Sequence, residues 1–176
     1  MKRRNRVRVI SMVVCLTLVW AVSGETANPP CDDEAYRAFD FWTGHWDVFM
    51  KDGTLAGHNS ITPEQQGCVL IEHWQSVQGG TGVSVNFFDL AQKKWRQMWV
   101  SPGTQIEISG NRRGDSMLLM GSITYLQDGG HFPFRGTWTL LSDGRVRQFF
   151  EEAREPGVWK PWFEGFYQRA EEPEAE

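Results

Sequence analysis

The sequence lacks the spacing patterns on which most metal, nucleotide and hydrolytic sites depend. Its histidines and cysteines show no HxH, HExxH or CxxC spacing, so we expect no metal site at His45, His58, His73 or His131. No nucleophile elbow stands out. The glycine-rich stretch 79–82 does not lead into a helix, which favours a hairpin turn over a phosphate-binding loop. We therefore expect no cofactor, and an enzyme is the less favoured reading.

The chain also lacks an uncharged run long enough to cross a membrane as a helix. Five basic residues lie between Lys2 and Arg8, and the uncharged run Val9–Gly24 is 16 residues long, whereas a spanning helix needs roughly 20. Small residues end this run, as a signal peptidase requires. Residues 1–24 are therefore predicted to be a cleaved signal peptide, with an uncleaved anchor as the alternative. Cys15 follows Val14, where lipoprotein processing needs Gly, Ala or Ser. We expect a periplasmic or secreted protein without a stable membrane anchor after cleavage.

Positive charge is scarce once the signal peptide is removed. The leader holds five of the 18 basic residues and none of the 22 acidic ones, so 18 minus 5 leaves 13 against 22, a net charge of −9. A protein that binds nucleic acid needs clustered Lys and Arg, so no nucleic-acid partner is expected. Residues 170–176 are mostly acidic and are predicted to form a solvated, disordered tail.

Cysteine is rare, with three residues in the whole chain. After export only Cys31 and Cys68 remain, and an even number of cysteines in an oxidising compartment favours a disulfide. This bond would tie the N-terminal segment, residues 25–38, to the body of the domain. Two free, buried thiols are the alternative.

Turn signals are abundant, recurring every 8 to 15 residues as pairs such as Asp52-Gly53 and Asp143-Gly144. Ten strands are predicted between the turns: Trp46–Lys51, Leu55–Thr62, Val69–Val77, Val83–Phe88, Trp95–Val100, Gln105–Gly110, Ser116–Tyr125, Phe132–Leu141, Val146–Ala153 and Trp159–Arg169. We expect an all-β domain over residues 39–169, a single antiparallel up-and-down β-barrel, because closure removes exposed strand edges. A β-sandwich is the competing architecture. The one helical turn is predicted around Asp33–Phe39.

The stretch Gly44-His45-Trp46 resembles the Gly-x-Trp signature of lipocalins and their calycin relatives. In those proteins the Trp lies across one end of the barrel, and an Arg from a late strand packs over its ring. By this resemblance Gly44, Trp46 and Arg169 would close the barrel, and a guanidinium is attracted to an indole face. Phe39 and Trp42 would pad the same end.

A longer series of motifs runs from Cys31 to Arg169: "FDFWTGHWDV", "LAGHNSI", "GCVLIEHWQS", "GTGVSVNFFD", "KKWRQMWV", "ISG", "MLLMGS", "GTWTLLSDGRVRQFFE" and "WFEGFYQR". In this pattern the chain is similar to a bacterial family of exported or cytoplasmic lipocalin-like domains, domain of unknown function 1579. Phe88 stands where the family often has Tyr, and Phe150 where it often has Trp. The resemblance implies a calycin-type barrel and no activity. Some lipocalin-like barrels hold haem through a late His, but residues 146–169 contain none.

Hairpin geometry predicts which side chains converge. If the turn at Gln78–Gly82 pairs Ser76 with Ser84, and the next turn pairs Phe88 with Trp95, two faces result. The polar-aromatic face holds Leu70, Glu72, Trp74, Ser76, Ser84, Asn86, Phe88, Trp95, Gln97 and Trp99. The apolar face holds Val69, Ile71, His73, Val83, Val85, Phe87, Met98 and Val100. We expect the first face inside, since three indoles would otherwise face water and its composition suits a small-molecule site. The alternative is that its polar residues are exposed, or satisfy one another in a closed core.

The predicted ligand-binding residues are Glu72, Trp74, Ser84, Asn86, Phe88, Gln97 and Trp99. Buried without a cation, Glu72 would have a raised pKa and could anchor a ligand or act as an acid or base. A structural pair with Arg135 or Arg147 is the favoured reading. The sequence thus favours an exported protein that binds a small apolar or amphipathic molecule. The alternatives are a cofactor-independent enzyme using Glu72, with Asn86 or Gln97 as oxyanion donors, and an interaction module with a filled barrel. The oligomeric state is left open.

Overall fold

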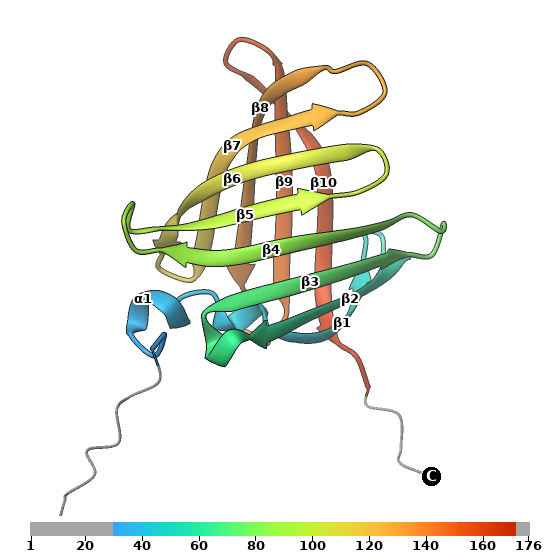
Figure 1. Cartoon of the computed structure of the whole chain (residues 1–176). Coiled ribbons are helices and arrows are strands. Elements are labelled where there is room, and N and C mark those ends of the chain that lie inside the picture. Colours follow the sequence, from blue (N-terminus) through green and yellow to red (C-terminus); the bar gives the residue numbers. More distant parts are fainter. Residues whose placement is uncertain (1–29, 172–176) are drawn as a thin grey trace, which may run out of the picture.

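Ten antiparallel strands form one closed barrel in the computed structural model, which describes residues 30–171 (Figure 1). Each strand pairs with its neighbours in the chain, and the last strand pairs with the first. The strands are β1 (Gly44–Phe49), β2 (Leu55–Glu64), β3 (Val69–Ser76), β4 (Thr81–Asp89), β5 (Lys94–Val100), β6 (Thr104–Arg113), β7 (Ser116–Tyr125), β8 (His131–Leu140), β9 (Val146–Glu155) and β10 (Val158–Arg169). Helix α1 (Glu34–Arg37) and the 3-10 turns η1 (Asp40–Trp42) and η2 (Gln65–Gly67) complete the fold.

The predicted fold class is confirmed: the domain is an all-β, up-and-down barrel preceded by a short helical segment. A sandwich is excluded because β1 and β10 pair, with Trp46 opposite Arg169. Both the predicted signal peptide and residues 172–176 of the predicted tail lie outside the described residues. Within residues 30–171, no helix is long and apolar enough to span a membrane.

The predicted pairing of β3 with β4 was wrong, whereas that of β4 with β5 is confirmed. Glu72 lies opposite Ser84, and not opposite Phe88, because the connecting turn is shorter than expected. Gly79 adopts a positive φ of 87°, so the chain reverses immediately after Ser76. Phe88 lies opposite Trp95 as predicted. The register error is four residues, an even number, so it leaves every side chain on its predicted face.

The barrel end that holds α1 and η1, here called the plug end, is filled by aromatic rings. Phe39 and Trp42 are fully buried and stack with ring centroids 4.9 Å apart, and Phe39 also meets Trp95 and Trp138 edge to face. Four such rings bury enough apolar surface to hold the short helical segment against the strands. As predicted, Phe39 and Trp42 pad this end.

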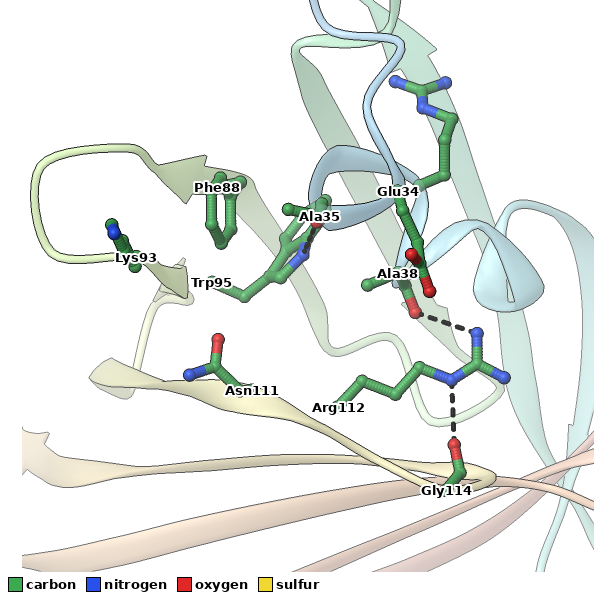
Figure 2. A pocket seen from close by; sticks show the side chains of 10 residues that line it. Glu34, Ala35, Ala38, Phe88, Lys93, Trp95, Asn111, Arg112 and Gly114 are labelled. Carbon is green, nitrogen blue, oxygen red and sulfur yellow. Dashed lines mark hydrogen bonds between the residues drawn. The ribbon is translucent and has the colours of Figure 1, made fainter.

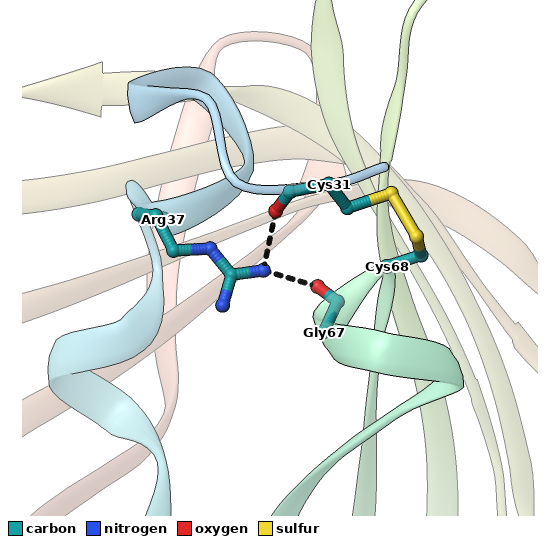
Figure 3. The surroundings of a disulfide bond; sticks show 4 residues. All are labelled: Cys31, Arg37, Gly67 and Cys68. Carbon is teal, nitrogen blue, oxygen red and sulfur yellow. Dashed lines mark hydrogen bonds between the residues drawn. A yellow bond between two sulfur atoms is a disulfide. The ribbon is translucent and has the colours of Figure 1, made fainter. Parts of the chain in front are cut away.

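A disulfide joins the N-terminal segment to the barrel at the plug end, as predicted (Figure 3). Cys31 and Cys68 are bonded, and the Arg37 guanidinium donates to the carbonyls of Cys31 (2.8 Å) and Gly67 (2.5 Å). The same arginine therefore bridges the two segments that the disulfide links.

Barrel closure at Gly44, Trp46 and Arg169 agrees with the predicted arrangement. The Arg169 guanidinium carbon lies 3.8 Å from the centre of the Trp46 ring, and Arg169 donates to the Thr43 carbonyl at 2.6 Å. Trp46 is buried and donates its indole N–H to the Trp42 carbonyl. Gly44 has a φ of 122°, and a Cβ there would lie 1.9 Å from the Arg169 guanidinium. Only glycine admits both this backbone conformation and this approach.

We expect Gly44→Ala to lower the free energy of unfolding by about 2 kcal/mol, because alanine is strained at this φ and displaces the Arg169 side chain. Urea unfolding followed by tryptophan fluorescence measures the change. Gly103→Ala is the matched control, since a Cβ at Gly103 meets no atom within 4 Å and its φ is not positive. Equal effects of the two substitutions would contradict a special role for Gly44.

Candidate ligand-binding cavity

A cavity of about 130 Å³ lies inside the barrel, on the side of the core away from the plug end. Ten side chains line it: Glu72, Trp74, Gln97, Trp99, Ile106, Gln148, Phe150, Trp162, Phe163 and Tyr167. The polar members, Glu72, Gln97, Gln148 and Tyr167, are buried and are here called the polar floor. Trp74, Trp99 and Trp162 retain some exposure and lie toward the opposite, open end of the barrel. The cavity thus combines apolar walls with a few convergent polar groups, as ligand sites do.

The predicted inward face is inside the barrel. Glu72, Ser84, Asn86 and Gln97 are each at most 3 % exposed, whereas Val83, Val85, Met98 and Val100 on the opposite face are 41 to 51 % exposed. Simple amphipathicity would place the apolar face inside the barrel, and the observed arrangement is the opposite. The apolar outer positions include neighbouring pairs, Val83 opposite Val100 and Val85 opposite Met98.

A glycine makes room for one of the cavity walls. A Cβ at Gly82 would lie 2.0 Å from the Trp99 indole, so the ring can rest directly against the β4 backbone. Gly82 also lies opposite Trp74. Two of the three wall tryptophans are therefore seated around one position where no side chain intrudes.

A chain of buried hydrogen bonds lies beneath the cavity, and the Leu70 carbonyl at its start determines which group donates in each bond. The Asn86 amide nitrogen donates to the Leu70 carbonyl (3.1 Å) and to Ser84 Oγ (2.8 Å), which leaves Asn86 Oδ1 to accept from Gln97 Nε2 (2.8 Å). Since Ser84 Oγ accepts from Asn86, its own proton is donated to Glu72 Oε2 (2.5 Å). A carbonyl can only accept, so the order of donors is fixed from Leu70 up to the carboxyl group.

A second branch reaches Glu72 from the other side. Asn59 Nδ2 donates to Glu72 Oε1 at 2.7 Å and to Tyr167 Oη at 3.1 Å, and Tyr167 in turn donates to Gln148 Oε1. Both carboxyl oxygens of Glu72 therefore accept a hydrogen bond from a neutral donor. This is the pattern that suits an ionised carboxylate.

The predicted pairing of Glu72 with Arg135 or Arg147 was wrong. Arg135 donates to Glu151, and Arg147 donates to Glu164 at 2.7 Å. These four residues alternate with the inward-facing ones, so their side chains meet on the outer surface and not in the barrel. No arginine, lysine or histidine is among the residues that line the cavity.

Burial raises the pKa of Glu72 from its usual range to about 7. Loss of water is the main cause, and the hydrogen bonds from Asn59 and Ser84 oppose it only in part. The pKa of the neighbouring Tyr167 lies well above its usual range, first because of burial and then because of the Glu72 charge. Near neutral pH, Glu72 can therefore exist both with and without its proton, while Tyr167 stays neutral.

Four of the seven predicted ligand-binding residues line the cavity: Glu72, Trp74, Gln97 and Trp99. Ser84 and Asn86 lie beneath the floor and act on it through hydrogen bonds. Phe88 is outside the cavity. It lies near the plug end, where its ring meets Tyr36 at 5.2 Å, because the shorter β3–β4 turn shifts β4 relative to β3.

Sequence reasoning missed the contribution of the late strands and of Asn59. Gln148 and Phe150 come from β9, and Trp162, Phe163 and Tyr167 from β10. Alternation along β9 was the available signal, since Val146, Gln148, Phe150 and Glu152 are buried and the residues between them less so. This alternation groups the side chains of β9 that share a face. It does not show that this face lies close to Glu72, because β9 and β3 are far apart in the sequence.

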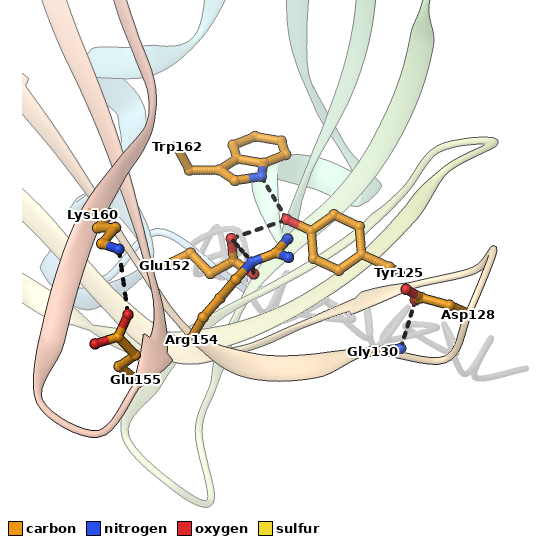
Figure 4. Close-up of polar contacts among 8 residues, drawn as sticks. All are labelled: Tyr125, Asp128, Gly130, Glu152, Arg154, Glu155, Lys160 and Trp162. Atoms are coloured by element: carbon orange, nitrogen blue, oxygen red, sulfur yellow. Dashed lines mark hydrogen bonds and ion pairs between the residues drawn. The ribbon is translucent and has the colours of Figure 1, made fainter.

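The open end carries a polar cluster that holds Trp162 (Figure 4). The Trp162 indole N–H donates to Tyr125 Oη (3.1 Å), which donates to Glu152 Oε2 (3.1 Å). Arg154 pairs with Glu152 and lies 5.0 Å from the centre of the Tyr125 ring. Trp162 is 39 % exposed and contacts Phe134 and Phe150 on its inner side. It thus forms part of the cavity wall with its edge in solvent.

A larger but open groove lies outside the barrel between α1 and the β4–β5 and β6–β7 hairpins (Figure 2). Three of its backbone carbonyls already accept hydrogen bonds, since Trp95 donates to Ala35 and Arg112 donates to Ala38 and Gly114. We favour the smaller internal cavity as the functional site because it encloses a buried carboxyl group, which the groove does not.

The comparisons with family models and with curated proteins gave no match. Among the described residues, no group of three or more His, Cys, Asp or Glu side chains is placed to hold a metal ion. The site must therefore be interpreted from its own geometry.

Proposed function

We propose that this chain is an exported member of the bacterial lipocalin-like family that it resembles, and that it binds a small apolar or amphipathic molecule in the barrel. The observation that carries the proposal is the cavity, in which aromatic walls lead to a buried polar floor. The predicted signal peptide, residues 1–24, supports a periplasmic or secreted location. The competing idea of a completely filled barrel does not account for this cavity.

The size of the cavity limits the ligand. About 130 Å³ is close to the roughly 150 Å³ of an engineered apolar cavity that binds benzene. A single aromatic ring or a short alkyl chain fits this space, with one polar end at the floor. A larger ligand would have to displace Trp162 or extend past it into solvent.

Binding of a one-ring compound tests the proposal. Toluene and benzyl alcohol are titrated into the purified protein and followed by tryptophan fluorescence, since three tryptophans line the cavity. Native mass spectrometry of the same preparation reports any molecule retained through purification. The absence of a saturable fluorescence change with every probe, together with no retained molecule, would exclude a binding role.

Trp162→Ala is expected to weaken binding of benzyl alcohol about tenfold, because it removes one wall of the cavity and opens the mouth. Trp159→Ala is the matched control. Trp159 lies on the same strand but stacks under Arg135 on the outer surface, at 4.3 Å. Isothermal titration calorimetry compares the two variants with the wild type. A similar loss in both would show that the effect is not specific to the cavity.

A second candidate function is proton-transfer catalysis by Glu72. It is favoured by one observation, the pKa of about 7 inside a cavity, which suits a general acid or base near neutral pH. Glu72→Gln separates the two roles once a turnover assay exists. An enzyme should lose turnover by orders of magnitude, whereas a binding protein has no turnover to lose.

A further inference from the structure

The cavity contains a carboxyl group that no cation among residues 30–171 balances. Glu72 is 3 % exposed, and its direct partners, Asn59 and Ser84, are both neutral. The groups that face it from the surrounding strands are Asn59 (β2), Ser84 (β4), Gln97 (β5), Gln148 (β9) and Tyr167 (β10). Of these only Tyr167 can titrate. A buried charge without a partner is costly, so a ligand that supplies the missing positive charge gains energy here.

The hydrogen-bonding groups left over in the floor are mainly acceptors. Each Glu72 oxygen accepts one bond from the protein and has capacity for another. Gln97 donates one of its two Nε2 hydrogens to Asn86, and no bond to another described residue uses its Oε1. Gln148 accepts from Tyr167 through Oε1, so the donors left in the floor are the Gln148 Nε2 group and the second hydrogen of Gln97 Nε2. The floor therefore accommodates a head group that donates several hydrogen bonds.

The walls suit the same kind of head group. Trp74, Trp99 and Trp162 line the cavity above the floor, with Phe150 and Phe163 beside them. The faces of aromatic rings carry partial negative charge and attract cations, most strongly the face of Trp. An anionic ligand would meet Glu72 and these rings without any compensating cation.

We propose that the cavity is selective for small primary ammonium ions, namely aryl or short alkyl amines whose head group bonds to Glu72 and Gln97 while the body packs against the tryptophans. This inference rests on the proposed binding function and specifies its ligand class. A neutral ligand would leave the Glu72 charge unbalanced, and a carboxylate ligand would be repelled by it.

The proposal gives binding a defined dependence on pH. An ammonium ion binds the ionised form of Glu72, and this form is a minority below pH 7. Tyr167 stays neutral over this range, because its pKa is raised. For a pKa of about 7, the ionised fraction falls about 30-fold between pH 8 and pH 5.5, and affinity follows it. Binding near or below pH 7 also releases a proton from Glu72.

Three one-ring probes that differ in charge test the proposal: benzylamine, benzyl alcohol and benzoate. Isothermal titration calorimetry with the full-length protein compares them at pH 8 and pH 5.5 in amine-free buffers. We expect benzylamine to bind most tightly at pH 8, to weaken about 30-fold at pH 5.5, and to release a proton near pH 7. Benzyl alcohol should bind with no such loss at pH 5.5, and benzoate should bind least.

Glu72→Gln should reduce benzylamine affinity at pH 8 at least tenfold and abolish its pH dependence, while Glu64→Gln on the exposed end of β2 leaves both unchanged. If Glu72→Gln does not fold, the proposal is still tested by the wild-type protein alone, through its pH profile and its relative affinities for the three probes. Tighter binding of benzyl alcohol or benzoate than of benzylamine at pH 8 would overturn the ammonium inference and leave the binding function standing. Failure of all three probes and of toluene to bind would remove both.

Discussion

Replacing Cys31 and Cys68 together by serine is expected to lower the free energy of unfolding by about 3 to 4 kcal/mol. The disulfide closes a loop whose ends are 37 residues apart in sequence, and a cross-link of this span restricts the unfolded chain by roughly this amount. The bond joins the segment that carries α1 to the residue just before β3. Urea unfolding of the double variant and the wild type at equal pH measures the difference.

Reduced wild-type protein is the control for this prediction. Treated with excess reductant, it should unfold at the same urea concentration as the double serine variant, since both lack only the cross-link. A wild type whose midpoint is insensitive to reductant would show that the bond does not form in the purified protein. A double variant as stable as the oxidised wild type would show that Arg37 and the aromatic packing of the plug end hold the segment without it.

Glu72→Gln is expected to raise the free energy of unfolding at pH 8 by about 3 kcal/mol. The native-state pKa of Glu72 is about 7, whereas its ordinary value is 4.5. Between these values the native protein holds a proton that the unfolded chain has lost, so stability falls as pH rises through this window and stays low above it. Each unit of difference corresponds to about 1.4 kcal/mol. A glutamine has no proton to lose and avoids the whole penalty.

The buried network can accept this substitution. Asn59 Oδ1 is buried without a hydrogen-bond partner among the described residues, so turning the Asn59 amide over would offer an acceptor to the new glutamine N–H₂ group, in exchange for the present bond from Asn59 to Tyr167. The measurement is urea unfolding of wild type and variant at pH 5 and pH 8. The two should be similar in stability at pH 5 and diverge by pH 8. Glu64→Gln, at an exposed position, controls for the change in net charge. Loss of stability at pH 8 in Glu72→Gln would contradict the prediction.

The ionised form of Glu72 therefore has two opposite effects: it lowers the stability of the free protein, and it provides the charge that the proposed ligand binds. The free protein keeps a carboxyl group that destabilises it above pH 7, and the proposed ammonium ligand would remove the penalty by balancing the charge. At pH 8, benzylamine should therefore raise the unfolding temperature of the wild type by more than that of Glu72→Gln.

Much of the fold could be predicted because its signals are local. Turn glycines mark where each strand ends, and alternation along a strand shows which side chains share a face, so β7 was predicted at its observed limits, Ser116–Tyr125. The same alternation placed Glu72, Asn86 and Gln97 on one face, and the tryptophans that share this face indicated that it points inward. The β3–β4 register could not be predicted in this way, because it depends on the left-handed conformation of Gly79, which composition alone does not fix.

The partners of Glu72 could not be predicted because they depend on closure of the ring. Tyr167 and Gln148 come close to Glu72 only when β10 pairs with β1 and brings the late strands round to β3. Both arginines considered as partners were better explained locally. Arg135 lies directly opposite Glu151 on the neighbouring strand, and this pair could have been found from the β8–β9 hairpin register.

Closure of the barrel also places the two ends of the described chain, where a tether can be attached, at the same end of the barrel. The described chain enters at Pro30, beside the disulfide, and leaves after Arg169, beside Trp46, so both of its ends lie at the plug end (Figure 1). The wall tryptophans lie toward the opposite end. A tether or reporter attached beside Pro30 or Arg169 would therefore begin at the end of the barrel that faces away from the wall tryptophans.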